Sequence, residues 1–179
     1  MNSNTQRLTK LHPMLILVTG LPGSGKTTFA RALCQQLSLQ HYNSDMMRDR
    51  LGLRGQYDQA TKQKVYTAML HEIRKILEQN QTVCVDATFY TSSVRRPFTN
   101  LAKALHKPVR WIEIQAPEKV IKERLQSKRK YSEADFAVYQ KISRIFEPIP
   151  EEHLTLSSEI LSLDQMVIQA SAFLQIERA

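Results

Sequence analysis

The sequence predicts an α/β fold, in which helices cover both faces of a parallel sheet. Short apolar runs of strand length alternate with amphipathic runs of helix length along the chain, and this alternation is typical of a parallel sheet. The 179 residues suffice for one domain with a sizeable core, and no repeat or linker divides them. We therefore expect a flexible N-terminal tail over residues 1–12 and a single domain over residues 13–179.

The order of the elements follows from the spacing of apolar residues and from prolines at helix ends. Val65, Met69, Ile73 and Ile76 recur at helical spacing and mark one face of a long helix. Pro117 fits the first turn of a later helix, because that position needs no backbone donor. The expected strands are 14–19, 41–43, 82–85, 109–114 and 154–156, and the expected helices are 26–37, 61–79, 94–105, one that starts near 117, 132–146 and 164–176.

A phosphate-binding loop follows the first expected strand. The segment Gly20-Leu21-Pro22-Gly23-Ser24-Gly25-Lys26-Thr27 fits the pattern G-x-x-x-x-G-K-S/T at every position. Its glycines let several backbone N–H groups point at phosphate oxygens, and the following helix adds its positive N-terminal end. We expect Lys26 to reach the β- and γ-phosphates of a nucleotide and the Thr27 hydroxyl to bind Mg²⁺. No Asn-Lys-x-Asp motif accompanies the loop, which disfavours a GTPase.

Asp45 and Arg48 come directly after the second expected strand. A carboxylate just beyond a strand can face the γ-phosphate across the cleft and accept the proton of an attacking hydroxyl. Arg48, three residues on, shares a helical face with Asp45 and can hold an anionic group of a substrate. In the alternative interpretation Asp45 caps the next helix and Arg48 is solvated. The spacing supports the two interpretations equally.

The run Val83-Cys84-Val85-Asp86 is an apolar strand that ends in an acid. This is the Walker B pattern, in which the acid holds Mg²⁺, often through water. Thr88 follows closely and is a candidate to orient Asp86 or to contact a substrate. Arg95 lies at the start of the next expected helix and is a candidate substrate contact, with an ordinary surface charge as the alternative.

A basic cluster of Arg124, Lys128, Arg129 and Lys130 separates two expected helices. Such a segment can close over bound phosphates and supply charge that stabilises the transition state. We favour this lid over an ordinary solvated turn, because the phosphate loop provides a site for it to cover.

The formal net charge of +8 suits a polyanionic partner, but a site that handles phosphates also needs many cations. No arginine-rich tract or RNA-binding motif is present, so nucleic acid is a less favoured partner. Cys34 and Cys84 are expected to be free buried thiols. No apolar run is long enough to span a membrane, and we see no export signal. We therefore expect a cytoplasmic protein without a membrane partner.

Together these segments resemble a group of small P-loop kinases related to phage polynucleotide kinase, gluconate kinase and zeta toxin. The likeness runs from about Met14 to Leu156, which is most of the chain. The combination of motifs is far more specific than any one of them. The segments that carry the likeness are Gly20 to Thr28, Ser44-Asp45-Met46-Met47-Arg48, Asp86-Ala87-Thr88, Glu123-Arg124-Leu125, Ser132-Glu133-Ala134-Asp135 and Phe146-Glu147-Pro148-Ile149-Pro150.

The resemblance implies a three-layer α/β/α P-loop fold, with a five-stranded parallel sheet in the order 2-3-1-4-5 and a basic lid. It implies ATP with Mg²⁺, and phosphoryl transfer to a hydroxyl. It makes Asp45 the base and Arg48 a substrate contact. It also makes Arg124, with either Lys128 or Arg129, the lid cations that bind the nucleotide.

Two positions depart from that family's pattern. A second lid arginine is common four residues after the first, where Lys128 stands here, and Asn is common where Phe89 stands. The second departure puts a polar contact to the acceptor in doubt. The family acts on very different acceptors, so a sugar acid, a nucleoside and a nucleic-acid 5′-hydroxyl all remain candidates.

The sequence therefore predicts an ATP-dependent kinase in which Lys26, Asp45 and Arg124 are catalytic. The alternative is a nucleotide-dependent switch or ATP-binding protein with little transferase activity. An open acceptor pocket at Asp45 would favour the kinase, and apolar packing there would favour the binding protein.

Overall fold

The computed structural model describes residues 12–126 and 136–175, and its five strands form one sheet in the order β2-β3-β1-β4-β5. All four neighbouring pairs are parallel, so the predicted fold and strand order are confirmed. The strands are β1 (Leu15–Thr19), β2 (Gln40–Asn43), β3 (Val83–Asp86), β4 (Val109–Gln115) and β5 (His153–Ser157). The helices are α1 (Lys26–Leu37), α2 (Ser44–Arg50), α3 (Gln59–Glu78), α4 (Ser92–Ala104), α5 (Glu118–Gln126), α6 (Phe136–Ser143) and α7 (Leu163–Gln175).

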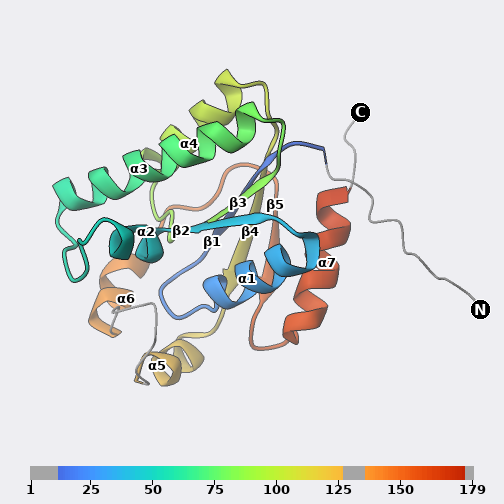
Figure 1. Ribbon diagram of the computed structural model, residues 1–179. Helices are drawn as coiled ribbons and strands as arrows, with labels where there is room; N and C mark the ends of the chain where they lie inside the picture. The colour runs from blue at the N-terminus through green and yellow to red at the C-terminus, as the bar shows by residue number, and fades with distance from the viewer. Residues whose placement is uncertain (1–11, 127–135, 176–179) are drawn as a thin grey trace, which may run out of the picture.

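Helices cover both faces of the sheet, with α3 and α4 on one side and α1 and α7 on the other (Figure 1). Successive side chains of a strand point to opposite faces. Leu15 and Leu17 of β1 therefore pack into the apolar cluster under α3 and α4, whereas Ile16 and Val18 pack into the cluster under α1 and α7. This burial on both sides explains why β1 is apolar at nearly every position.

The carboxyl ends of the central strands meet at one edge of the sheet. The parallel register places Asp86 at the end of β3 beside Val18 of β1 and beside Asn43 of β2. The phosphate loop leaves β1 at this edge, and α2 begins there directly after β2. Ligands bind at this edge in open α/β sheets.

The observed elements differ from the expected ones mainly near the predicted lid. The expected helix over 132–146 ends at Ser143, and its first residues lie outside the described ranges. The expected tail over residues 1–12 lies almost entirely outside them as well. Both cysteines are free and buried, as predicted. In residues 12–126 and 136–175, no helix has the length and apolar character that crossing a membrane requires.

Candidate active site

The loop between β1 and α1 is shaped by glycines in conformations that other residues rarely adopt. Gly23 and Gly25 have φ angles of +91° and +97°, where side chains are strained. At Gly20, a Cβ atom would overlap the carbonyl oxygen of Ile114 in β4. Gly25 precedes α1 without a side-chain cap, so the N–H groups of the first helical turn face the loop and suit an anion.

Asp86 is held at the end of β3 by side chains from α1 and β2. The Thr27 hydroxyl donates to Asp86 Oδ1 at 3.0 Å, and Asn43 Nδ2 donates to the same oxygen at 2.6 Å. The ring nitrogen Nε2 of His41 lies 2.5 Å from Asp86 Oδ2. The structure thus brings together Thr27 and Asp86, the two residues that the sequence assigned to Mg²⁺.

This donor set fits Mg²⁺ bound together with a nucleotide. A hydroxyl and a carboxylate are hard oxygen ligands, and Mg²⁺ at such sites keeps several waters and takes further oxygens from the phosphates. No cluster of three or more His, Cys, Asp or Glu side chains suited to a metal occurs within the described ranges, so a cage built only from protein is absent from that part of the chain.

Asn43 links Asp86 to the start of α2. Its side-chain oxygen accepts hydrogen bonds from the backbone N–H groups of Asp45 at 2.9 Å and Met46 at 3.0 Å. Asn43 is therefore the N-cap of α2, and the alternative in which Asp45 caps this helix is wrong. Sequence reasoning missed both Asn43 and His41. A signal for Asn43 existed, because it ends a strand that is parallel to the strand of Asp86.

Asp45 and Arg48 form an ion pair on one face of α2, with Arg48 Nη1 and Asp45 Oδ1 2.7 Å apart. Arg48 is only 6% exposed and its Nε also donates to the carbonyl of Gln56 at 3.1 Å. It is therefore not the solvated residue of the alternative interpretation. Burial raises the pKa of Asp45 above its ordinary value, and this effect outweighs the lowering by Lys26 and Arg48. A raised pKa suits a carboxylate that accepts a proton.

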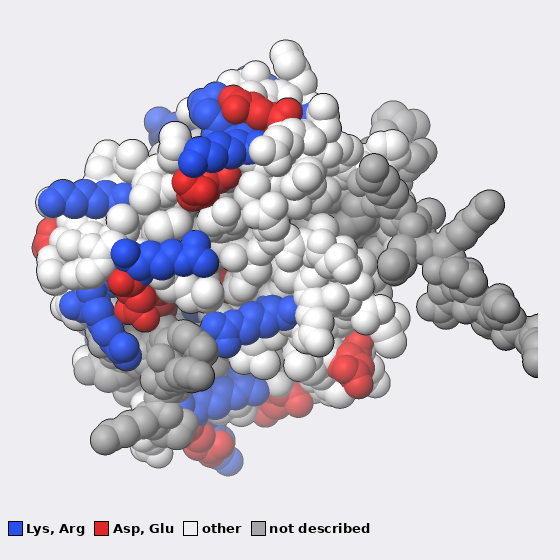
Figure 2. Space-filling view, viewed as in Figure 1, with Lys and Arg blue, Asp and Glu red and all other residues white. Residues whose placement is uncertain are grey.

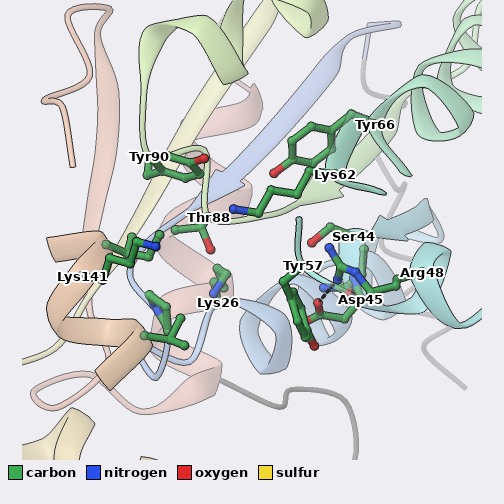
Figure 3. Close-up of a pocket in the computed structure, with 14 residues that line it drawn as sticks. Lys26, Ser44, Asp45, Arg48, Tyr57, Lys62, Tyr66, Thr88, Tyr90 and Lys141 are labelled. Carbon is green, nitrogen blue, oxygen red and sulfur yellow. Dashed lines mark hydrogen bonds and ion pairs between the residues drawn. The ribbon is translucent and has the colours of Figure 1, made fainter. Parts of the chain in front are cut away.

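Lys26 and Asp45 line one cavity of about 320 Å³ at this edge of the sheet. Figure 3 shows their side chains around a central space, with the Thr88 hydroxyl also directed into it. Thr88 lines the cavity, and its role as a substrate contact stays a prediction. Its carbonyl accepts a hydrogen bond from Thr19 at 2.7 Å. The other described lining residues are Pro22, Asn43, Ser44, Arg48, Tyr57, Lys62, Tyr66, Tyr90, Val138, Lys141 and Ile142.

Arg95 lies outside this cavity, contrary to its predicted role as a substrate contact. The residue is 4% exposed. Its Nε donates to the carbonyl of Phe89 and its Nη1 to the carbonyl of Pro148, each at 2.7 Å, and its Nη2 donates to the carbonyl of Glu147. Arg95 therefore ties the loop after β3 to the segment before β5. The surface-charge alternative also disagrees with this burial.

Phe89, which departs from the family pattern, belongs to the core. Its side chain is fully buried and packs edge-to-face on Phe98 and Trp111, with ring centres 5.1 and 5.6 Å away. Its backbone has a φ of +48°, which is uncommon for an aromatic residue. No polar side chain therefore stands at this position.

Arg124 contacts the phosphate loop but does not line the cavity that holds Lys26 and Asp45. Its Nη1 donates to Ser158 Oγ at 2.8 Å and its Nη2 to the Ser158 carbonyl at 3.0 Å. Arg124 and Ser158 line a second depression together with Gly25 and Thr28. The structure thus joins Arg124 to two predicted nucleotide-binding residues, but not to the cavity that holds Lys26 and Asp45.

Ser158 was missed by sequence reasoning, because it follows β5 and lies far from the loop along the chain. Its hydroxyl donates to the Ser24 carbonyl at 2.6 Å, so it braces the phosphate loop directly. Lys128 and Arg129, the alternatives for a second lid cation, lie outside the described residues, as does Lys130.

A family model described as an AAA domain matches residues 15–149, which is well over half of the chain. The chain belongs to this AAA domain family. This is a kinase-like family of P-loop proteins, and a named kinase is among the relatives of this chain. The L-seryl-tRNA(Sec) kinase of Methanococcus maripaludis is 28% identical over 109 residues, which cover 58% of this chain and 42% of that kinase. The chain therefore spans less than half the length of the curated relatives that it matches.

Solved structures of two other kinases share the fold of this AAA domain. The APS kinase of Mycobacterium tuberculosis, in complex with AMPPNP and APS, has a TM-score of 0.72 at 17% identity over 93% of this chain and 99% of that one. The gluconokinase of Sinorhizobium meliloti has a TM-score of 0.68 at 17% identity over 92% and 93% of the two chains. At these identities the likeness establishes the fold alone.

Proposed function

We propose that this chain is an ATP-dependent kinase that moves the γ-phosphate of ATP to a hydroxyl group of a small molecule or of a nucleic-acid end. The observation that carries the proposal is that Lys26 of the phosphate loop and Asp45 of α2 line the same cavity. A triphosphate held by the loop and an acceptor held in the cavity would therefore meet beside a carboxylate.

In the proposed reaction the acceptor oxygen attacks the γ-phosphorus and forms a new P–O bond. The bond from the γ-phosphorus to the bridging oxygen breaks, and its electron pair leaves with ADP. The proton of the acceptor hydroxyl passes to Asp45, whose raised pKa favours this transfer. Lys26 and the N–H groups of the loop hold the β- and γ-phosphates in line. Mg²⁺ held by Thr27, and by Asp86 through water, would neutralise the charge of these phosphates.

The competing function is a nucleotide-dependent switch or binding protein with little transferase activity. Such a protein needs the phosphate loop but no acceptor space. The open cavity beside Asp45 favours the kinase, because apolar side chains packed at that point would have closed the approach to the γ-phosphate.

The test is Asp45→Asn, which keeps the size of the side chain but removes the proton acceptor. Transfer of labelled γ-phosphate should fall by roughly 10²- to 10⁴-fold, while ATP affinity stays near that of the wild type. The thermal midpoint should hold, because Asn43 and not Asp45 caps α2, and because the side-chain oxygen of the new asparagine can still accept the hydrogen bond from Arg48. Asp49→Asn is the matched control: Asp49 is an exposed acid on the same helix, and its replacement should leave transfer unchanged.

Transfer at the wild-type rate in Asp45→Asn would show that this carboxylate is not the base. ATP binding by the wild type without transfer to any hydroxyl acceptor would favour the switch or binding protein instead.

A further inference from the structure

The cavity beside Asp45 carries a surplus of positive charge. Among the described residues that line it, Lys26, Arg48, Lys62 and Lys141 are cations and Asp45 is the sole acid. Lys26 belongs to the phosphate loop, and Arg48 is paired with Asp45 at 2.7 Å. The amines of Lys62 and Lys141 thus belong neither to the phosphate loop nor to the ion pair between Arg48 and Asp45.

Lys62 of α3 and Lys141 of α6 approach the cavity from opposite walls, and Figure 3 shows both side chains directed toward the central space. Over residues 12–126 and 136–175, neither amine makes a hydrogen bond or an ion pair, and Lys62 lies 5.5 Å from the centre of the Tyr90 ring. Two like charges that face one space repel each other until an anion enters between them.

The rest of the wall suits a compact molecule with polar groups and an apolar part. Tyr57, Tyr66 and Tyr90 line the cavity, and Val138 and Ile142 of α6 add an apolar surface. Burial raises the pKa of Tyr66 to about 12, so its hydroxyl remains a neutral hydrogen-bond donor at ordinary pH. A volume of about 320 Å³ lies at the small end of the range for ligand pockets.

We propose that the phosphate acceptor is a small hydroxyl compound that carries its own oxyanion, either a carboxylate or a phosphate. Its hydroxyl would lie at Asp45, and its oxyanion would lie between Lys62 and Lys141. This inference rests on the proposed kinase function and narrows it. It also assigns two specificity-determining residues that the motifs do not include.

A nucleic-acid end is also anionic, but a strand needs a continuous basic track that leads away from the cavity. On the face drawn in Figure 2, lysine and arginine side chains are separated by acidic and uncharged ones. The described lining of the cavity, by contrast, places four cations and a single acid around one small space. A small acceptor therefore fits these observations better than a strand.

The experiment uses matched compounds that differ in charge. The probes are glycerol, glycerate and glycerol 3-phosphate, then ribose and ribose 5-phosphate, and finally an oligonucleotide with a free 5′-hydroxyl. Binding is measured by calorimetry on the full chain loaded with Mg²⁺ and a non-hydrolysable ATP analogue, and transfer is measured separately with labelled ATP. The variants are Lys62→Met and Lys141→Met. The control is Lys64→Met, because Lys64 is exposed on the same helix as Lys62 and does not line the cavity.

A charged compound should bind more tightly than its neutral counterpart. Each cavity substitution should weaken that binding by roughly 10- to 100-fold, the loss expected for one charge-assisted hydrogen bond. Lys64→Met should bind the charged compounds as tightly as the wild type does. The substitutions should not change the affinity for the ATP analogue or for the neutral compounds. Carboxylate and phosphate probes are compared to show which oxyanion the two lysines prefer.

The outcomes separate this inference from the kinase proposal. Lysine-dependent binding of charged compounds without transfer would support an oxyanion site at Lys62 and Lys141, but would overturn the kinase and with it the role of the bound compound as a phosphate acceptor. Equal binding of neutral and charged compounds, unaffected by either substitution, would overturn the inference even where transfer occurs. Binding or transfer confined to the oligonucleotide would replace the small acceptor with a nucleic-acid end.

Discussion

Arg95→Met should destabilise the fold without disabling the chemistry of the cavity. The guanidinium of Arg95 is buried and donates hydrogen bonds to the carbonyls of Phe89, Glu147 and Pro148. Methionine fills much of the same volume but offers no donor. The loop after β3 and the segment before β5 would lose the side chain that joins them.

The expected loss follows from the surroundings of each carbonyl. A hydrogen bond from a charged donor contributes about 1.5–3 kcal/mol. Phe89 is fully buried, so its carbonyl loses its partner without gaining water. Glu147 and Pro148 are exposed, and water can replace much of what their carbonyls lose. We therefore expect a total loss of about 3–4 kcal/mol, which lowers Tm by roughly 6–16 °C for a chain of this length.

The assay is thermal and urea unfolding of Arg95→Met beside Arg96→Met. Arg96 is the exposed neighbour on α4, so its replacement should leave Tm within the scatter of the wild type. Acceptor KM, measured below the lower Tm, should be little changed in both variants. An unchanged Tm with a raised acceptor KM in Arg95→Met would mean that Arg95 contacts the substrate, and the argument from burial would then be wrong.

Three further predictions concern the site. Transfer should decline as pH falls through the raised pKa of Asp45, because the protonated carboxyl accepts no proton. A profile of kcat/KM against pH whose acid limb lies at the ordinary pKa of an aspartate would contradict this. Gly23→Ala should lower the free energy of unfolding by about 1–3 kcal/mol, because the new Cβ would lie 2.8 Å from the side chain of Ile121. An unfolding curve that matches the wild type would contradict this clash. Asn43→Ala should cost about 1–2 kcal/mol through the lost cap of α2 and should raise the Mg²⁺ concentration needed for half-maximal transfer, since Asn43 also holds Asp86. Unchanged stability together with an unchanged Mg²⁺ requirement would argue against both roles.

The phosphate loop was predictable because its function depends on neighbours in sequence. Glycines, a lysine and a hydroxyl residue at fixed spacing determine where the backbone curls and where the helix begins. The alternation of strands and helices was predictable for a similar reason, since hydrophobic periodicity reports local geometry. The approach of Asp86 to Thr27 followed from these two facts, because parallel strands place their carboxyl ends at one edge.

Asp45 and Arg95 show where such reasoning ends. Spacing allowed Asp45 to be a base or a helix cap. The position of Asn43 excludes the cap, and the role of Asp45 as a base stays a prediction. Arg95 begins a helix near the site, as a substrate contact would. Its orientation depends on residues 146–150, which the chain reaches about fifty residues later.

By itself the sequence determined the fold class, the phosphate loop and the chemical types available to the site. The tertiary structure alone decided which charged side chains face the cavity, because burial and direction depend on how distant elements pack. Lys62 and Lys141 look like ordinary surface lysines in the sequence, and Ser158 like an ordinary loop residue. The packing of α3 and α6 brings Lys62 and Lys141 to the cavity beside Asp45. The end of β5 brings Ser158 to the phosphate loop.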